Sequence, residues 1–164
     1  MRSLDISFDD YVFVDFGSGK GRTLLLAAEA GFKRCEGVEF SAELNRVARS
    51  NLQAYRSGRF ADKVIIHDMD AAQYTVPDDE PCVIYLYNPF GGPVFSAVLE
   101  RIIDSWKRRP RDMWIIYLNP KLASRVEQTG IFHRCARRIP HRVRDLYLLP
   151  EPLAIYRARG EPGR

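Results

Sequence analysis

One stretch, Tyr11–Arg22 with the sequence YVFVDFGSGKGR, restricts the possible folds more than any other part of the chain. It opens with the β-branched and aromatic run Tyr11–Val14, as expected of a strand that is buried on both faces. Asp15 and a glycine-rich turn follow, and then Thr23–Ala30, a run of strong helix formers that ends at Gly31. This order of strand, glycine turn and helix would place unobstructed backbone N–H groups and a helix N-terminus at the carboxyl end of a strand, where open α/β sheets bind their ligands.

The spacing of the three glycines, Gly17, Gly19 and Gly21, distinguishes between kinds of nucleotide-binding loop. A dinucleotide-binding fingerprint would need a glycine at position 22, where the chain has Arg22. A phosphate-binding loop would need a glycine at position 14 and a hydroxyl residue at position 21, but the chain has Val14 and Gly21 there. The pattern that remains is Asp-x-Gly-x-Gly-x-Gly, and its alternative is a plain glycine-rich turn between a strand and a helix.

Strand-like apolar runs alternate with helix-like patterns over most of the chain, and the last two strand-like runs have no helix between them. This order predicts an α/β fold: a Rossmann-like, seven-stranded, mostly parallel sheet with helices on both faces and a C-terminal antiparallel β-hairpin. We expect a single domain over residues 1–160 and a frayed tail over 161–164. The expected strands are Tyr11–Phe16, a segment ending at Val38-Glu39, Val64–His67, Cys82–Tyr87, Met113–Leu118, Phe132–Ile139 and Leu153–Arg159. The expected helices are Lys20–Ala30, a helix capped by Ser41 that continues through Tyr55, Val94–Arg108 and Leu122–Thr129.

The composition is that of an ordinary globular domain and argues against membrane and secreted classes. Hydrophobic residues make up 46% and charged residues 28% of the 164 positions. No apolar run reaches the roughly 18 residues of a membrane helix, and the N-terminus has no signal-peptide pattern. Three scattered cysteines, Cys35, Cys82 and Cys135, suit a reducing compartment. We therefore expect a soluble cytoplasmic protein without a membrane partner.

Charge is distributed unevenly along the chain. Residues 1–99 carry 10 basic and 14 acidic side chains, a net charge of −4, whereas residues 100–164 carry 15 basic and 7 acidic side chains, a net charge of +8. A basic half can attract nucleic acid or an acidic partner. The basic residues are spread over an expected helix face, loops and strand ends without aromatic residues between them, which favours a solvated surface. A nucleic-acid partner stays open on this evidence.

The glycine pattern and its surroundings resemble those of the class I S-adenosylmethionine-dependent methyltransferases. The resemblance covers about residues 11–159 and is carried by the segments VFVDFGSGKGRTLLLAA, GVEFS and YLYNPFG. It is greatest for a group of small bacterial methyltransferases of undefined substrate. The resemblance implies that S-adenosylmethionine is the cofactor and that its methyl group is transferred to an acceptor. The acceptor, whether a small molecule, a protein or RNA, is not identified by the sequence.

Acidic residues at two further strand ends are the expected contacts to the nucleoside. Glu39 can accept hydrogen bonds from both ribose hydroxyls in this fold, and its alternative role is a surface glutamate before a helix cap. Beyond the third strand, the resemblance implies that Asp70, followed by a small residue, accepts from the adenine amino group, with Asp68 as the alternative. The cofactor-binding residues are therefore expected to be Asp15, Gly17, Ser18, Gly19, Gly21, Glu39, Phe40, Asp70, Ala71 and Asn88.

The fourth strand is followed by Asn88-Pro89-Phe90-Gly91. Methyltransferases that act on planar amino nitrogens commonly have Asp/Asn-Pro-Pro-Tyr/Phe at this place, where polar oxygens hold the amino group and the ring stacks on the acceptor. This chain has the asparagine and one proline, but its aromatic residue comes one position early. The resemblance makes Asn88 and Phe90 the candidate catalytic residues, and an Asn-Pro turn that ends a buried strand is the alternative.

The chain departs from the class I methyltransferase pattern before its first strand, and this departure leaves alternative functions open. Class I enzymes usually have helices before the first strand, and about ten residues precede Tyr11 here. We therefore expect one of three explanations: the acceptor site is unusually open, a partner supplies a lid, or this chain lacks part of a longer protein. A non-catalytic or partner-dependent S-adenosylmethionine-binding module of the same fold is the alternative to an enzyme. An NAD-type oxidoreductase is disfavoured by Arg22, and we assign no metal because His67, His133 and His141 lack ligand spacing.

Overall fold

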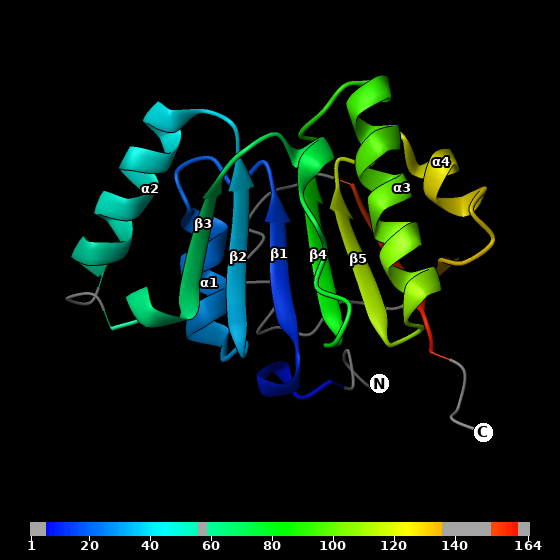
Figure 1. Ribbon diagram of the computed structural model, residues 1–164, viewed down its shortest axis with the longest axis horizontal. Coiled ribbons are helices and arrows are strands. Elements are labelled where there is room, and N and C mark those ends of the chain that lie inside the picture. The colour runs from blue at the N-terminus through cyan, green and yellow to red at the C-terminus, as the bar shows by residue number, and fades with distance from the viewer. Residues whose placement is uncertain (1–5, 56–58, 136–151, 161–164) are drawn as a thin grey trace.

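The computed structural model describes residues 6–55, 59–135 and 152–160 and has a seven-stranded sheet at its centre (Figure 1). The strands are β1 (Val12–Phe16), β2 (Arg34–Glu39), β3 (Val64–Asp68), β4 (Cys82–Tyr87), β5 (Met113–Leu118), β6 (His133–Arg134) and β7 (Leu153–Ala158). Their order is β3-β2-β1-β4-β5-β7-β6. The first five in this order are parallel, and β7 pairs antiparallel with both β5 and β6. The predicted mostly parallel sheet with an antiparallel C-terminal strand pair is confirmed.

Helices cover both faces of this sheet, as predicted (Figure 1). The helices are α1 (Arg22–Ala30), α2 (Ala42–Ala54), α3 (Gly92–Arg108) and α4 (Ala123–Glu127), with short 3₁₀ helices η1 (Phe8–Asp10), η3 (Ala61–Lys63) and η4 (Ala71–Gln73). Leu24 of α1 and Leu52 of α2 belong to the apolar core on one face. Ile102 of α3 and Val126 of α4 belong to the core on the other face.

The central strand β1 contributes side chains to both cores. Val12, Val14 and Phe16 pack with α3 and α4, whereas Phe13 packs with α1 on the opposite face. This alternation is the two-residue period of a strand, and burial on both faces accounts for the continuous apolar run in the sequence. The same geometry buries Asp15 near the carboxyl end of the strand, next to the glycine turn.

Helix boundaries differ from the predicted ones by a few residues. Helix α1 begins at Arg22 rather than at Lys20, because Gly21 has a left-handed backbone with φ +76°. Helix α4 is shorter than the predicted helix at its start, because Leu122 has non-helical backbone angles. The predicted cap of α2 is confirmed, since Oγ of Ser41 accepts a hydrogen bond from the Leu44 N–H at 3.3 Å.

Two predicted segments reach beyond the described residues. The strand expected over 132–139 is described as His133–Arg134, and positions 136–139 lie outside the described ranges, as does the tail expected over 161–164. Within the described ranges, no helix combines the length and the apolar character needed to cross a membrane.

The parallel strands all end at one edge of the sheet. In the register of neighbouring strands, Glu39 at the end of β2 lies opposite Asp68 of β3, and Tyr87 at the end of β4 lies opposite Leu118 of β5. The loops that follow these strands therefore meet at the same edge, which is where open α/β sheets hold ligands.

Candidate functional site

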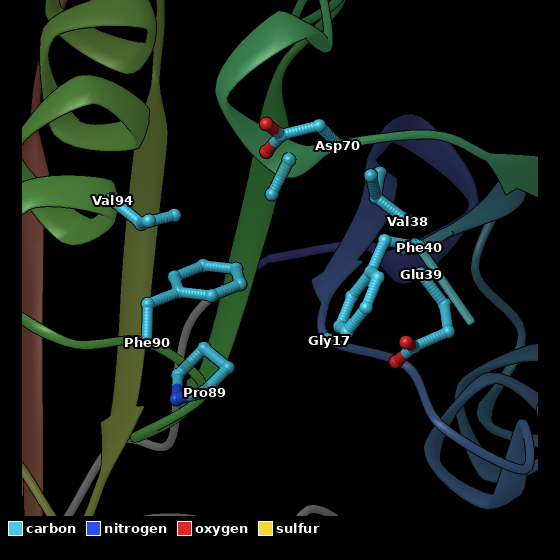
Figure 2. Close-up of a pocket in the computed structure, with 9 residues that line it drawn as sticks. Gly17, Val38, Glu39, Phe40, Asp70, Pro89, Phe90 and Val94 are labelled. Atoms are coloured by element: carbon cyan, nitrogen blue, oxygen red, sulfur yellow. The ribbon is translucent and has the colours of Figure 1, made fainter.

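A cavity of about 290 Å³ lies at this carboxyl edge, among the loops that follow β1, β2, β3 and β4 (Figure 2). Its volume is close to the lower end of the range of roughly 300–1,000 Å³ that is typical of small-molecule sites. Figure 2 shows Phe90 and Pro89 on one side of the cavity, Glu39 and Phe40 on the other, and Asp70 at one end. The lining residues are Gly17, Val38, Glu39, Phe40, Asp70, Ala71, Pro89, Phe90 and Val94.

The glycine turn after β1 packs directly against the loop after β4. Gly17 has a left-handed backbone with φ +78°, and a Cβ added to it would lie 2.7 Å from Cβ of Pro89. Gly19 is also left-handed, but an added Cβ would have no atom within 4 Å. Gly21 lies against Ala48 of α2, whose Cβ would be 3.1 Å from an added Cβ. Only a residue without a side chain allows the approach of the two loops at position 17, and this approach forms part of the cavity wall.

The turn's backbone N–H groups are used within the protein, which corrects the expectation that they are unobstructed. The N–H groups of Gly17 and Ser18 donate to the carbonyl oxygen of Val38, at 2.8 and 3.3 Å. The N–H of Gly19 donates to Oε2 of Glu39 at 3.2 Å. These bonds fasten the turn to the end of β2. These three N–H groups are therefore not available to a ligand. The glycines of the turn instead allow the neighbouring chain segments to lie close together at the site.

Glu39, the predicted ribose ligand, is held in place by backbone donors. The residue is buried, with an exposed fraction of 7%. Its Oε2 accepts from the Gly19 N–H at 3.2 Å, and its Oε1 accepts from the Ser41 N–H at 3.0 Å. An ionised carboxylate has about four acceptor positions, so each oxygen keeps capacity for a further donor. The side chain thus presents a fixed carboxylate to the cavity.

Asn45 is a buried neighbour of this site that was not predicted from the sequence. Its Nδ2 donates to the backbone carbonyl of Glu39 at 2.8 Å, and its Oδ1 has no hydrogen-bond partner among the described residues. A signal was present in the sequence, because Asn45 lies on the same helix face as Ala48 and Leu52, which are buried. An amide on the buried face of a helix indicates a polar partner, which here is the end of β2.

Asp15 and Ser18 are buried beside the turn but do not line the cavity. Burial raises the pKa of Asp15 to about 8, and the negative charge of Glu39 adds to the effect. The Ser18 hydroxyl is buried without a hydrogen-bond partner in the described part of the chain. A buried hydroxyl without a partner in the described residues is of the kind that a ligand can satisfy.

The structure separates the two aspartates that were alternatives for the adenine contact. Asp68 pairs with Arg49 on the surface, with Oδ2 at 2.6 Å from Nη2 of the arginine. Asp70 lines the cavity, and its Oδ1 accepts from the Ala72 N–H at 2.9 Å, which caps η4. Oδ2 of Asp70 accepts no hydrogen bond from the described residues. Ala71, the next residue, also lines the cavity. Of the two aspartates, Asp70 lines the cavity and Asp68 does not.

The loop after β4 supplies an apolar wall. Phe90 and Val94 line the cavity together with Pro89, and Phe40 lies across from them with 83% of its surface exposed (Figure 2). Asn88 is half-buried, has a left-handed backbone with φ +41°, and is not among the lining residues. Of the two candidate catalytic residues, Phe90 lines the cavity and Asn88 does not.

Six of the predicted residues meet at this cavity, and five do not line it. Those at the cavity are Gly17, Glu39, Phe40, Asp70, Ala71 and Phe90, and those that do not line it are Asp15, Ser18, Gly19, Gly21 and Asn88. Val38, Pro89 and Val94 also line the cavity but were not predicted as site residues, because they belong to segments that were interpreted as strand, turn and helix.

Comparison with known proteins gives matches in structure only. No protein-family model and no curated protein matches the sequence. A putative S-adenosylmethionine-dependent methyltransferase from Listeria monocytogenes matches with a TM-score of 0.61 and 12% identity, over 95% of this chain and 94% of that one. A putative RNA methyltransferase from Pyrococcus horikoshii matches with a TM-score of 0.57 and 20% identity, over 93% and 75%. The StiE O-MT segment 961–1257 matches with a TM-score of 0.62 and 10% identity, over 94% and 69%.

At these identities the likeness establishes the fold. The chain has the fold of the class I S-adenosylmethionine-dependent methyltransferases, which confirms the fold that the sequence resemblance implied.

Proposed function

We propose that the chain is a methyltransferase that binds S-adenosylmethionine in the cavity at the carboxyl edge of the sheet. One observation carries this proposal. Gly17, Glu39 and Asp70 follow or end three different strands, yet they line the same cavity, which Phe90 also lines. These are positions at which the sequence resemblance implies cofactor and acceptor contacts, and a coincidence of all four at one cavity is much more specific than any one of them.

The chemistry of the residues present fits an adenosyl group. Both oxygens of Glu39 keep acceptor capacity for the two ribose hydroxyls after binding the Gly19 and Ser41 N–H groups. Oδ2 of Asp70 is available to an amino group, and the exposed ring of Phe40 offers an aromatic face to a base. Two of these three side chains, those of Glu39 and Asp70, are held at the cavity by hydrogen bonds from the protein's own backbone.

The chain's contribution to the reaction is positioning and exclusion of water. When bound, S-adenosylmethionine supplies an electrophilic methyl group carried on a positively charged sulfur. Pro89, Phe90 and Val94 form the apolar wall that keeps water from the reacting atoms. Orientation of this kind can supply roughly 7–11 kcal/mol, so the protein needs no nucleophile of its own. A general base is required only for an acceptor that arrives protonated.

The positions of the candidate residues on either side of β1 also determine the direction in which a bound nucleoside would point. Glu39 and the nearby Asp70 lie on the β2 and β3 side of β1, whereas Asn88 and Phe90 lie on the β4 side. A nucleoside held by the two carboxylates therefore directs its reactive end toward the loop after β4. We propose Phe90 as the ring that contacts the acceptor and Asn88 as its polar neighbour.

The acceptor class stays open among a small molecule, a protein and RNA. The names of the structural neighbours include both an RNA methyltransferase and an O-MT segment, so they do not select one. The basic second half of the chain gives little support to nucleic acid, because several of its arginines are paired with acids. These pairs are Arg108 with Asp78, Arg134 with Glu127, and Arg157 with Asp112.

A second candidate is a module of the same fold that binds the cofactor without transferring its methyl group. The observation that favours it is the position of Asn88, which does not line the cavity. The charged side chains at the cavity, Glu39 and Asp70, are both assigned to the nucleoside. Binding and transfer must therefore be measured separately.

Methyl-labelled S-adenosylmethionine, incubated with the protein and with crude small-molecule, protein or RNA fractions in turn, tests the proposal. We expect label in one fraction and a product whose mass has increased by one methyl group. The variant Phe90→Ala should reduce transfer by about tenfold, because it removes the proposed stacking surface. Ile65→Ala, an exposed position on β3, serves as the control and should leave transfer unchanged. Cofactor binding without transfer to any fraction would favour the binding module over the enzyme.

A further inference from the structure

Asn45 of α2 is completely buried, although the protein uses only part of its side-chain amide. Its exposed fraction is 0%, and its Nδ2 donates to the backbone carbonyl of Glu39 at 2.8 Å. Its Oδ1 has no hydrogen-bond partner among the described residues. A buried acceptor without a partner costs stability, so an apolar side chain would suit this face of the helix better. Local choices that cost stability in this way are typical of functional sites.

The carbonyl of Glu39 does not need Asn45 as its donor. It also accepts a hydrogen bond from the Met69 N–H, at 3.2 Å, so it would keep a partner without the Asn45 amide. What the amide adds is a link between the end of β2 and the first turn of α2. The place of this link, rather than the need to satisfy a buried carbonyl, therefore accounts for the asparagine.

The end of β2 is a place where such a link matters. Glu39 is the last residue of β2, and the register of β2 with β1 ends one residue earlier, at the pair of Val38 and Phe16. Residues beyond the last pair of a strand are held less firmly than those within the sheet. A carboxylate that binds a ligand through two hydrogen bonds must nevertheless keep a fixed orientation. The backbone of Glu39 therefore needs an anchor outside the ladder with β1.

The amide of Asn45 closes a ring of hydrogen bonds around Glu39. The backbone N–H of Asn45 donates to the Ser41 carbonyl at 3.0 Å, and the Ser41 N–H donates to Oε1 of Glu39 at 3.0 Å. The Asn45 side chain then returns to the Glu39 carbonyl. The same short segment thus holds both the backbone and the carboxylate of Glu39, and the Gly19 N–H holds the second carboxylate oxygen.

We infer that Asn45 is a positioning residue for the nucleoside, whose amide holds the end of β2 so that the Glu39 carboxylate can receive both ribose hydroxyls. Asn45 does not line the cavity, and it acts through Glu39, which does. The inference rests on the proposed function. It adds a residue from α2 that the sequence resemblance did not supply.

The same helix offers a matched control for Asn45. Nδ2 of Asn51, an exposed residue of α2, donates to the Lys20 carbonyl at 3.0 Å. Asn45→Ala and Asn51→Ala therefore each remove one bond from an asparagine amide to a backbone carbonyl, and only the first bond reaches Glu39. Alanine favours the helix, so both variants should fold. Asn45→Leu, which keeps the branched shape, replaces Asn45→Ala if the space left by alanine prevents folding.

Titration with adenosine and with 2′,3′-dideoxyadenosine, followed by nuclear magnetic resonance, measures what the ribose hydroxyls contribute to binding. Adenosine should bind the unmodified protein roughly tenfold or more tightly than the dideoxy compound. We expect Asn45→Ala to reduce this ratio of affinities by about threefold or more and Asn51→Ala to leave it unchanged. A role in packing alone would weaken both nucleosides alike, so an unchanged ratio in Asn45→Ala overturns the inference. Equal affinities in the unmodified protein would overturn it as well.

Hydrogen exchange of the Ser41 N–H gives a readout that needs no ligand, because this group donates to the Glu39 carboxylate. Asn45→Ala should accelerate its exchange, and Asn51→Ala should not. Unchanged exchange in Asn45→Ala, or equal acceleration in both variants, overturns the inference. If the unmodified protein binds neither nucleoside, the proposed function fails, and the exchange comparison still decides whether Asn45 holds Glu39.

Discussion

Gly17 and Gly19 have the same left-handed backbone in different surroundings, which makes them a matched pair for mutation. An alanine at either position pays the left-handed penalty of roughly 1–2 kcal/mol. At position 17 the new Cβ would also lie 2.7 Å from Cβ of Pro89, whereas at position 19 it would meet no atom within 4 Å. Overpacking adds roughly 1–3 kcal/mol. In urea denaturation, we therefore expect Gly17→Ala to lower the free energy of unfolding more than Gly19→Ala.

Equal losses of stability in the two variants would contradict the close contact between the glycine turn and the β4 loop. A larger loss in Gly19→Ala would do the same. The comparison needs no ligand, so it tests the local geometry independently of the proposed function.

At the same scale, the sequence predicted residues whose roles depend on their own chain neighbours. Glu39 could be selected because it ends a predicted strand just before the helix cap Ser41, whereas Asp70 was selected over Asp68 through the family resemblance. The contact between Gly17 and Pro89 could not be predicted, because it joins loops that are far apart in the sequence. The engagement of the turn's N–H groups by β2 was missed for the same reason.

Between elements, a buried polar cluster joins β2 to β3 and to the segment after η4. Glu36 of β2 accepts from Nε of Arg34 at 2.8 Å and from the hydroxyl of Tyr74 at 2.8 Å, and it lies 2.7 Å from Nε2 of His67. Burial acts to raise the pKa of Glu36, but the hydrogen bonds from His67, Arg34 and Tyr74 outweigh it and lower the pKa to about 2.

This cluster predicts a pH dependence of stability with a definite sign. The folded-state pKa of Glu36 lies below its ordinary value of 4.5, so the stabilising effect is present above pH 4.5 and is lost as the pH falls toward about 2. The full effect is roughly 3 kcal/mol. The variant Glu36→Gln should lose most of this pH dependence in urea denaturation between pH 4.5 and 2. Glu43→Gln, at an exposed position in α2, should keep it.

If Glu36→Gln and the unmodified protein lose stability in parallel over this range, the cluster does not hold the carboxylate as described. The cluster was not predicted from the sequence, because Glu36 and His67 come together only through the register of β2 and β3. The elements themselves were predictable, since each has a clear periodicity. The starts of α1 and α4 were predicted too early in the chain, because the backbone angles of Gly21 and Leu122 are non-helical.

Over the whole molecule, the alternation of strands and helices was enough to predict a seven-stranded, mostly parallel sheet and its antiparallel strand pair. Parallel strands connected by helices have few acceptable arrangements, and the antiparallel return of β7 follows from the missing helix before it. The location of the cavity, at the carboxyl edge of the sheet, could be predicted, but most details of its wall could not. Its lining by Val38, Pro89 and Val94 depends on three-dimensional packing that no local pattern contains.

The measurement that most directly tests the account is calorimetric titration of the protein with S-adenosylhomocysteine, with NAD as the comparison ligand. We predict that the unmodified protein binds S-adenosylhomocysteine and not NAD. Glu39→Gln, which keeps the shape of the side chain but not its charge, should weaken this binding by about tenfold or more, because a ribose hydroxyl loses a charge-assisted acceptor. Undiminished affinity in Glu39→Gln, or no binding by the unmodified protein, would contradict the account.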